Sequence, residues 1–252
     1  LLINAGYSVE KKLVTSRDIY MKDQFPDKVD VAPEYVGGVL DYLSTVNDPD
    51  AETITTSDLD ETLTAGEQLM KEKGIAFLNP AEATDTNAFF VTQEYAEDND
   101  VSKLSDLRGK KITLAGHADC EARLDCAKGL EKVYGIKLKE VLPLGFASDQ
   151  TYQSVADGES QLGLTSTTDG TLEEQGFVLL EDDKSVQPVQ NLVPVVSQKF
   201  LDDHTDVVDA LNPLMDKLTT DDLTELNRRV GVEREKVEDV AQDYLTEQSL
   251  LG

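Results

Sequence analysis

The sequence predicts an α/β protein with two lobes. Apolar, strand-like segments alternate with helical segments along the 252 residues, a pattern typical of parallel sheets covered by helices on both faces. In addition, two apolar segments about 100 residues apart, 88–96 and 192–200, enclose one such α/β region. We therefore expect one lobe to be inserted in the other, with these segments as hinge-crossing strands and a central ligand cleft between the lobes. The predicted boundaries place 1–87 and 195–252 in lobe I and 88–194 in lobe II.

Helices and strands alternate from the start of the chain. Gly6 ends a first helix, Pro26 breaks a second, and Gly74 stops a third, which begins at Ser57 with an N-cap and early acidic residues. The acidic, polar segment 47–58 predicts a loop. The helices expected in this region are 1–6, 17–25, 38–46 and 57–74, and the expected strands are 8–14, 28–33 and 75–80.

Beyond the first crossing segment, the same two patterns continue. Short apolar runs predict strands, and segments with an apolar stripe after an Asp, Ser or Thr predict helices. The strands expected here are 110–116, 140–145, 160–170 and 177–183. The helices expected here are 104–107, 124–134, 149–158, 207–218, 220–230 and 234–245.

The composition excludes several classes of partner. Fifty acidic and 23 basic residues give a net charge of −27, which repels phosphate backbones and anionic lipid headgroups, so we expect no nucleic-acid partner. This excess of acid fits salt adaptation or simple solubility equally well. No apolar run approaches the ~20 residues that cross a bilayer. The sequence does not begin with Met and opens on what resembles the end of a helix, so we expect it to be a piece of a longer chain.

The two cysteines, Cys120 and Cys126, favour a local disulfide. Zinc sites usually need four nitrogen or sulfur ligands, and the chain has two histidines, so we expect no metal. A disulfide implies an oxidising, extracytoplasmic location, and two free buried thiols are the alternative. His117 precedes Cys120 by three residues, but no orienting third group or catalytic motif accompanies them. We therefore expect no catalytic residue and no cofactor.

Six segments occur in an order that resembles one protein family. With them, the chain is similar to the osmoprotectant-type substrate-binding proteins of ABC importers, which carry glycine betaine, choline, carnitine and related compounds. The resemblance runs from about residue 5 to residue 251. PEY-x-G together with TDG and LEDDK is its most specific part. The segments are VDVAPEYVGG (29–38), DTNAFFVT (85–92), EARLDCAKGLEKVYG (121–135), STTDGTLEEQGFVLLEDDK (166–184), PVV (194–196) and LNRRV (226–230).

The resemblance implies a class II periplasmic-binding-protein fold and a function in transport. Members of the family close two lobes on a small ligand and deliver it to a membrane permease. For this chain we expect a small zwitterionic or polar ligand, a permease partner and a monomer. We expect an extracytoplasmic location, either lipid-anchored at the cell surface or periplasmic. The resemblance implies a binding protein and not an enzyme.

Family members hold a trimethylammonium head in a box of aromatic rings and clamp the carboxylate with Arg or Lys, because ring faces attract a cation that cannot donate hydrogen bonds. Tyr35 matches the tyrosine of the PEY motif, and Arg123 matches the arginine before the D-x-x-x-GL helix. Thr168 and Asp169 match the TDG turn. The alternatives are a half-buried tyrosine that caps the following helix and a turn shaped by Thr168 and Asp169. For Arg123 the alternative is a surface pair with Asp119, Glu121 or Asp125.

Three aromatic positions of the family are not aromatic here. Asn87, Ser166 or Thr167, and Gln190 stand in their places, and Gly38 stands where Thr is frequent. Losing up to three rings removes ~1–2 kcal/mol each from binding of a desolvated cation. The amide and hydroxyl groups instead suit a ligand with hydroxyls, amides or a primary amine.

Asn87 and Gln190 are candidate ligand contacts because they lie at the start of, or just before, the crossing segments. Hydrogen bonding within the hinge is their alternative role. Arg17 follows a predicted strand-to-helix turn and is a further candidate, with a helix-surface charge near Asp18 as the alternative.

Three hypotheses follow from the resemblance and its departures. The first is a quaternary-amine binder whose cage is rebuilt from Phe89, Phe146 or Tyr152. The second is the same scaffold adapted to a more polar ligand, such as a polyol, sugar or amino-acid derivative. The third is an enzyme on a two-lobed fold.

Overall fold

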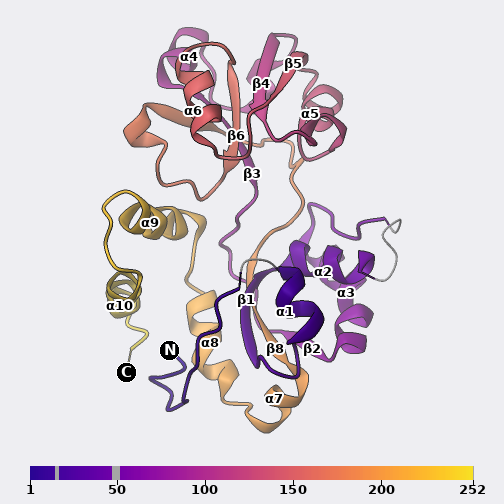
Figure 1. Ribbon diagram of the computed structural model, residues 1–252, viewed down its shortest axis with the longest axis vertical. Helices are drawn as coiled ribbons and strands as arrows, with labels where there is room; N and C mark the ends of the chain where they lie inside the picture. The colour runs from indigo at the N-terminus through magenta and orange to yellow at the C-terminus, as the bar shows by residue number, and fades with distance from the viewer. Residues whose placement is uncertain (15–16, 47–51, 252) are drawn as a thin grey trace. The chain divides into compact units, whose positions relative to one another are not determined.

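The computed structural model describes residues 1–14, 17–46 and 52–251 (Figure 1). The chain forms two compact units. Unit 1 comprises 1–84, 189–226 and 235–252, and unit 2 comprises 85–188 and 227–234. Most of unit 2 is therefore an insertion in unit 1. The lobe boundaries expected from the sequence, at 87/88 and 194/195, lie close to these points and stay predictions.

The sheet of unit 1 has the order β1-β8-β2, and the central strand β8 is antiparallel to both neighbours. Its core gathers buried residues of α1, α2 and the sheet, among them Met21, Val39, Leu40 and Val195. The strands are β1 (Val31–Tyr35), β2 (Ile75–Phe77) and β8 (Leu192–Ser197). The helices are α1 (Arg17–Asp23), α2 (Val36–Thr45), α3 (Leu59–Lys73), α7 (Gln198–Asp203), α8 (Val207–Met215), α9 (Thr220–Gly231) and α10 (Val237–Glu247). Residues of α9 from Asn227 onward belong to unit 2.

The first elements of the chain differ from those expected. Residues 2–6 form turns, and Gly6 has a φ of 94°, so the helix expected at 1–6 is wrong. Residues 8–14, expected to be a strand, have no regular structure and are exposed. A strand needs a neighbour to satisfy its backbone, and this charged segment pairs with none in the described chain. The end of the loop expected at 47–58 is irregular from residue 52, and 47–51 lie outside the described residues.

The sheet of unit 2 has the order β5-β4-β6-β3-β7. Strands β5, β4 and β6 are parallel, whereas β3 is antiparallel to both β6 and β7. The strands are β3 (Asn87–Thr92), β4 (Lys111–Gly116), β5 (Lys137–Pro143), β6 (Leu162–Ser166) and β7 (Phe177–Leu180). The helical segments are α4 (Gln93–Asn99), η1 (Leu104–Leu107), η2 (Cys120–Ala122), α5 (Ala127–Gly129), η3 (Leu130–Tyr134), α6 (Asp149–Ala156) and η4 (Glu173–Gln175).

Both faces of this second sheet are buried. Alternate residues of β3 point to opposite faces. Phe89 and Val91 accordingly join a core with η1, α5 and η3, and Phe90 joins a core with Val155 of α6 and Phe177. This arrangement confirms a sheet covered on both sides. The parallel pairing expected for the sheets holds for β5, β4 and β6, and it is wrong for the two crossing strands.

Both crossing segments are shorter strands than expected. Strand β3 ends at Thr92, whose hydroxyl accepts the Tyr95 N–H at 3.0 Å and so begins α4. Residues 93–96 are consequently helical. Residues 198–200 lie in α7, which follows β8 directly, although the Ser197 side chain makes no capping bond. None of the helices in the described parts of the chain has the length and apolar character that spanning a membrane requires.

Candidate functional site

One edge of the unit 2 sheet collects predicted site residues. Asn87, the first residue of β3, pairs across the ladder with Ser166, the last residue of β6. The neighbouring parallel strand β4 ends at Gly116, and the loop after it carries Arg123. In open α/β sheets, ligands bind at the carboxyl ends of such parallel strands. The topology therefore brings Asn87 and the Arg123 loop to the edge where a ligand is expected.

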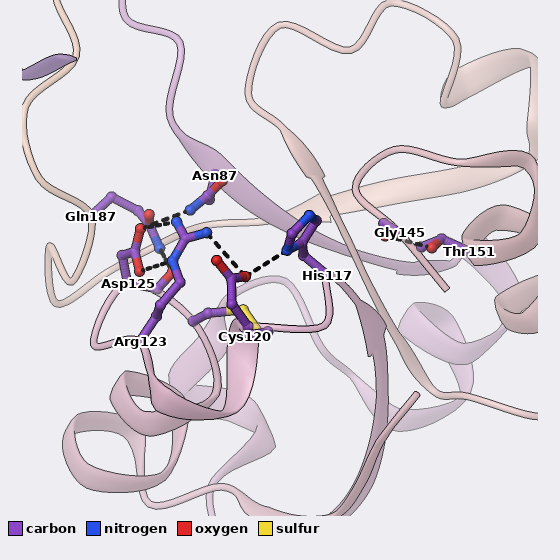
Figure 2. Close-up of a disulfide and its surroundings, with 10 residues drawn as sticks. Asn87, His117, Cys120, Arg123, Asp125, Gly145, Thr151 and Gln187 are labelled. Carbon is purple, nitrogen blue, oxygen red and sulfur yellow. Dashed lines mark hydrogen bonds and ion pairs between the residues drawn. A yellow bond between two sulfur atoms is a disulfide. The ribbon is translucent and has the colours of Figure 1, made fainter. Parts of the chain in front are cut away.

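Asp125 joins these two predicted residues (Figure 2). Its Oδ1 accepts the Nε–H of Arg123 at 2.9 Å, and its Oδ2 accepts an N–H from Nη2 of the same guanidinium and from Asn87 Nδ2 at 3.0 Å. Hydrogen bonding to Asp125, partly opposed by burial, raises the pKa of Arg123. One of the alternatives expected for Arg123, a pair with Asp125, is therefore present in this structure. Its role as a ligand clamp stays a prediction.

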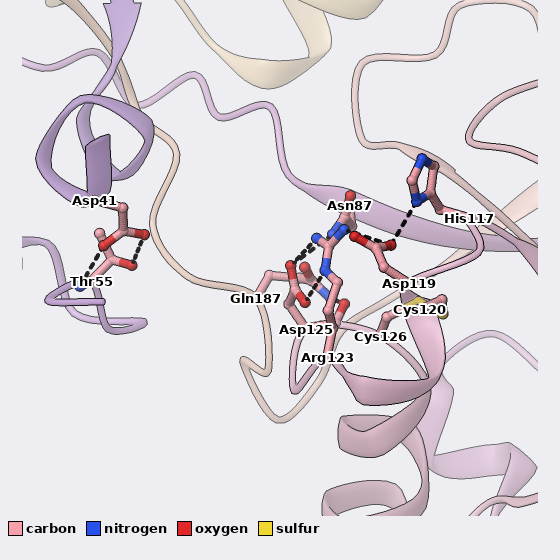
Figure 3. A network of polar contacts seen from close by, with 10 residues as sticks. All are labelled: Asp41, Thr55, Asn87, His117, Asp119, Cys120, Arg123, Asp125, Cys126 and Gln187. Carbon is pink, nitrogen blue, oxygen red and sulfur yellow. Dashed lines mark hydrogen bonds and ion pairs between the residues drawn. A yellow bond between two sulfur atoms is a disulfide. The ribbon is translucent and has the colours of Figure 1, made fainter. Parts of the chain in front are cut away.

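Arg123 also reaches a more exposed carboxylate. Its Nη1 lies 3.5 Å from Oδ1 of Asp119, and His117 Nδ1 lies 2.6 Å from the same oxygen (Figure 3). Hydrogen bonding to His117, with the nearby Arg123 charge, lowers the pKa of Asp119 below its ordinary value. Asp119 and His117 are more than half exposed, whereas the Asp125 side chain is 22% exposed. Asp125 is thus the better shielded partner of Arg123.

A disulfide closes the loop that carries Arg123. Cys120 and Cys126 are bonded, as expected, and both are fully buried in the unit 2 core. Within this loop the Arg123 carbonyl accepts the N–H of Cys126 and of Lys128. The helix expected from Leu124 therefore begins only at Ala127. In the described parts of the chain, no group of His, Cys, Asp and Glu residues is arranged to hold a metal ion.

Sequence reasoning missed Gln187, which supports Asp125 from the other side. Its Nε2 donates to the Asp125 backbone carbonyl at 2.9 Å, while its Oε1 is buried and accepts no hydrogen bond. The LEDDK segment holds Gln187 in place, because Asp182 accepts the N–H groups of Val186 and Gln187. The LEDDK motif could have indicated this arrangement, because an aspartate before an irregular segment often accepts backbone N–H groups and so forms a turn.

The TDG turn is held by its own hydrogen bonds. Asp169 accepts from the hydroxyls of Thr165, Thr171 and Tyr152 and from the Thr171 N–H. Burial alone raises the pKa of Asp169, but these bonds outweigh it and lower the pKa overall. Burial and Asp169 raise the pKa of Tyr152 to about 12. Thr168 is buried, and its hydroxyl donates to Asp85 at 3.0 Å. The turn-shaping alternative is present for both residues, and their ligand contacts stay predictions.

Two of the rings proposed to rebuild a cage lie in hydrophobic cores. Phe89 is almost fully buried, and Tyr152 packs against Phe90 and Phe177 with ring centroids 5.3 and 6.0 Å apart. Phe146 is exposed. Phe89 is therefore enclosed by its core, whereas Tyr152 is half-buried beside two other rings, and a cage rebuilt from these rings stays a prediction.

In unit 1, the PEY motif ends β1 and begins α2. Tyr35 is half-buried and takes the N-cap position, but its side chain makes no capping bond. Its neighbour Glu34 is buried, and its carboxylate accepts from Arg17 Nε at 3.0 Å, Arg17 Nη2 at 2.7 Å, the Tyr20 hydroxyl and the Tyr35 N–H. Sequence reasoning missed Glu34. It fixes Arg17 beside the start of α2.

The two glycines after Tyr35 allow close approach at the start of α2. The Gly38 N–H donates to Gln190 Oε1 at 3.0 Å, so Gln190 caps this helix from far along the chain. A Cβ at Gly38 would lie 2.5–2.8 Å from the Arg17 guanidinium atoms. Arg17 therefore occupies the space that a side chain at position 38 would need. Among the described residues, no hydrogen bond from the Gln190 amide nitrogen is found.

Two hollows lie away from the predicted residues. In unit 1, Leu1, Asn4, Asp206 and Pro213 help to line one of about 300 Å³. In unit 2, another of about 510 Å³ lies over α6 and has walls rich in Asp, Gln and Glu. Neither is lined by a predicted site residue, so the polar contacts above, and not these hollows, define the candidate site.

Comparison with known proteins identifies the family. The sequence matches, over residues 1–247, the family described as the substrate-binding domain of ABC-type glycine betaine transport systems. The chain belongs to this family. It is also 28% identical over 229 residues to the glycine betaine-binding protein YehZ of Escherichia coli K12. This alignment covers 86% of this chain and 73% of that protein.

Solved structures agree on the fold. Apo YehZ from E. coli superposes with a TM-score of 0.69 at 27% identity, over 88% of this chain and 81% of that one. A structure described as a glycine betaine/carnitine/choline ABC transporter superposes with a TM-score of 0.78 at 21% identity, over 95% and 86%. The predicted two-lobed periplasmic-binding-protein fold is confirmed. As a substrate-binding protein of an ABC importer, the chain is extracytoplasmic and serves a membrane permease.

Proposed function

We propose that this protein captures a small zwitterionic or polar osmolyte of the glycine betaine, choline and carnitine class for import. The family match over residues 1–247 is the observation that carries the proposal. In this proposal the protein acts by binding and not by catalysis. It works as a monomer, lipid-anchored at the cell surface or free in the periplasm, and passes its ligand to the permease.

Each unit supplies ligand-binding groups of its own in this proposal. In unit 1 these are Tyr35, whose ring face attracts an ammonium group, together with Arg17 and Gln190. In unit 2 they are Asn87 and Arg123, whose guanidinium grips a carboxylate. Thr168 and Asp169 belong to the TDG turn that follows β6, and they add a further predicted contact. The shared contact of Asn87 and Arg123 with Asp125 supports their assignment to one site.

A more polar ligand is the second candidate. Asn87 and Gln190 stand where the family resemblance expects rings, and both already hydrogen-bond through their amides, to Asp125 and to the Gly38 N–H. Half-buried amide groups favour ligands that donate and accept hydrogen bonds over ligands that present only methyl groups. Polyols, sugars and amino-acid derivatives meet this requirement.

A thermal-shift panel tests the proposed function. We expect at least one of glycine betaine, choline and carnitine to raise the melting temperature, because a ligand at 100 times its Kd stabilises the folded state by about 2.7 kcal/mol. Tyr35→Ala should abolish that shift, and Tyr35→Phe, which keeps the ring, should retain it. A shift with polyols, sugars or amino acids alone would support the second candidate. Recovery of chemically altered ligand, or no shift with any compound, would contradict the proposal.

A further inference from the structure

Arg123 already holds a carboxylate that belongs to its own loop. The Nε and Nη2 groups of its guanidinium both point to Asp125, two residues further along the chain, in the two-bonded arrangement that arginine uses for carboxylates. A ligand carboxylate needs the same two N–H groups. Asp125 therefore occupies the position at which the proposed function places the ligand's carboxylate.

The position of Asp125 is fixed from three other directions. Asn87 donates to its Oδ2 at 3.0 Å, Gln187 donates to its backbone carbonyl at 2.9 Å, and the disulfide at Cys126 adjoins it (Figure 3). Such support distinguishes this contact from the exposed pair of Asp119 and His117. The Arg123–Asp125 pair is part of a hydrogen-bond network with Asn87 and Gln187. A substitution of any one member should therefore alter the contacts of the others.

We propose that Asp125 competes with the ligand's carboxylate for Arg123, and that it thereby favours cationic alcohols over zwitterionic carboxylates. This inference rests on the proposed function and names the ligand class of the same site. A carboxylate tethered two residues away has a high effective concentration at the guanidinium. Only the fraction of molecules in which Asp125 has left Arg123 can clamp a ligand carboxylate, and the apparent Kd rises accordingly. A ligand without a carboxylate avoids this penalty, because it leaves Asp125 in place on Arg123.

Gln187 provides an independent indication of the same ligand class. Its side chain is 8% exposed, and its Oε1 is buried without a hydrogen-bond partner. The Nε2 of the same amide donates to the Asp125 backbone carbonyl. Oε1, which is bonded to the same carbon as Nε2, is therefore also held near the Asp125 backbone. An unsatisfied buried acceptor is rare in native proteins, and in this proposal a ligand supplies the missing donor to Gln187 Oε1. A hydroxyl group supplies such a donor, and a trimethylammonium group does not.

Calorimetric titration of the full chain with choline and with glycine betaine tests the inference. Both ligands carry the same trimethylammonium head, and they differ in a hydroxyl against a carboxylate. We expect the wild-type protein to bind choline at least tenfold more tightly than glycine betaine. In Asp125→Asn the ratio of the two affinities should move at least tenfold toward glycine betaine, because Arg123 loses its internal partner.

Asp119→Asn is the matched control, since Asp119 also approaches Arg123 but is exposed. It should change the ratio by less than threefold. Asn87→Ala removes one hydrogen bond to Asp125 but keeps the Asp125 charge, and it should move the affinity ratio in the same direction as Asp125→Asn. If Asp125→Asn does not fold, Asn87→Ala serves as the test of the inference. An unchanged ratio, or a move toward choline, in a wild-type protein that binds either ligand overturns this inference and leaves the proposed function intact. Absence of binding to the whole panel in wild type and variants overturns both.

Discussion

At the scale of single residues, carboxylates with several hydrogen bonds fix the turns of unit 2. Asp169 accepts four such bonds, from Tyr152, Thr165 and Thr171. Although its burial alone raises its pKa, these bonds hold the pKa below the ordinary value of 3.8. A carboxylate of this kind stabilises the folded state only while it is ionised.

Replacing Asp169 by Asn should therefore have a pH-dependent effect. The contribution of Asp169 is fully present above its unfolded-state pKa of about 3.8, and it is lost as the pH falls through the lower folded-state value. We expect Asp169→Asn to lower the free energy of unfolding by roughly 2 kcal/mol near pH 7. The difference from wild type should shrink below pH 3.8. Urea unfolding at pH 7, 5 and 3 measures it.

Asp157→Asn is a matched control, because the exposed Asp157 accepts a single side-chain hydrogen bond, from Gln153. Its effect should stay within about 0.5 kcal/mol at each pH. A loss in Asp169→Asn that is the same size at pH 3 and pH 7 would contradict the role given to the ionised carboxylate.

At the scale of elements, the loop between β4 and α5 depends on a covalent bond. The disulfide closes the segment 120–126, which contains both Arg123 and Asp125 and has only one short turn of helix, η2. A bond across so short a loop stabilises the folded state mainly by restricting the unfolded chain. The order of this loop, and with it the geometry of Arg123, is therefore tied to the cysteines.

Removing the disulfide should destabilise the protein and weaken ligand binding together. We expect Cys120→Ala with Cys126→Ala to lower the free energy of unfolding by roughly 2 kcal/mol. A reducing agent should lower the melting temperature of the wild type and leave that of the double variant unchanged, which controls for effects elsewhere. Calorimetry with the ligand found in the panel should show several-fold weaker binding. Equal melting temperatures of oxidised and reduced wild type would refute this role of the loop.

Sequence patterns predicted most helices and strands, and they failed where tertiary contacts determine the direction or the end of an element. The stripes and caps of α3, α6, α9 and α10 are local signals, and those helices appear near the expected positions. Strand direction is not local. The order of β8 between β1 and β2, antiparallel to both, depends on where the chain returns from unit 2. Likewise, the apolar run 88–96 could not reveal that Thr92 would cap a helix inside it.

The ligand contacts of Tyr35, Asn87 and Arg123 stay predictions that rest on motif order, and the structure adds the side chains with which two of them pair. The sequence placed several acids near Arg123, and only the shape of the closed loop decides that Asp125 takes both N–H groups while Asp119 stays at 3.5 Å. Gln187 lies 62 residues from Asp125, so no spacing rule connects them.

At the scale of the whole molecule, the net charge of −27 dominates. Like charges at this density repel one another, and the repulsion is weaker in the more expanded unfolded chain. Ions in solution screen interactions between exposed charges beyond about 8 Å at physiological ionic strength. The folded state should therefore be more stable in salt.

We expect the melting temperature at pH 7 to rise by at least ~3 °C between 20 mM and 500 mM sodium chloride. The same comparison near the sequence pI of about 4.2 is the control, because the net charge there is close to zero and screening has little to act on. Equal salt effects at the two pH values would show that the repulsion of the acidic surface is not the cause.

The bare backbone at Gly38 has a consequence for engineering. The Arg17 guanidinium lies where a side chain at position 38 would project. A substitution of Gly38 therefore requires a simultaneous substitution of Arg17. Replacing Gly38 alone by threonine would displace the Arg17 guanidinium from Glu34. Glu34 would then be left enclosed without its counter-charge, so the substitution would be unsuccessful for reasons unrelated to the ligand.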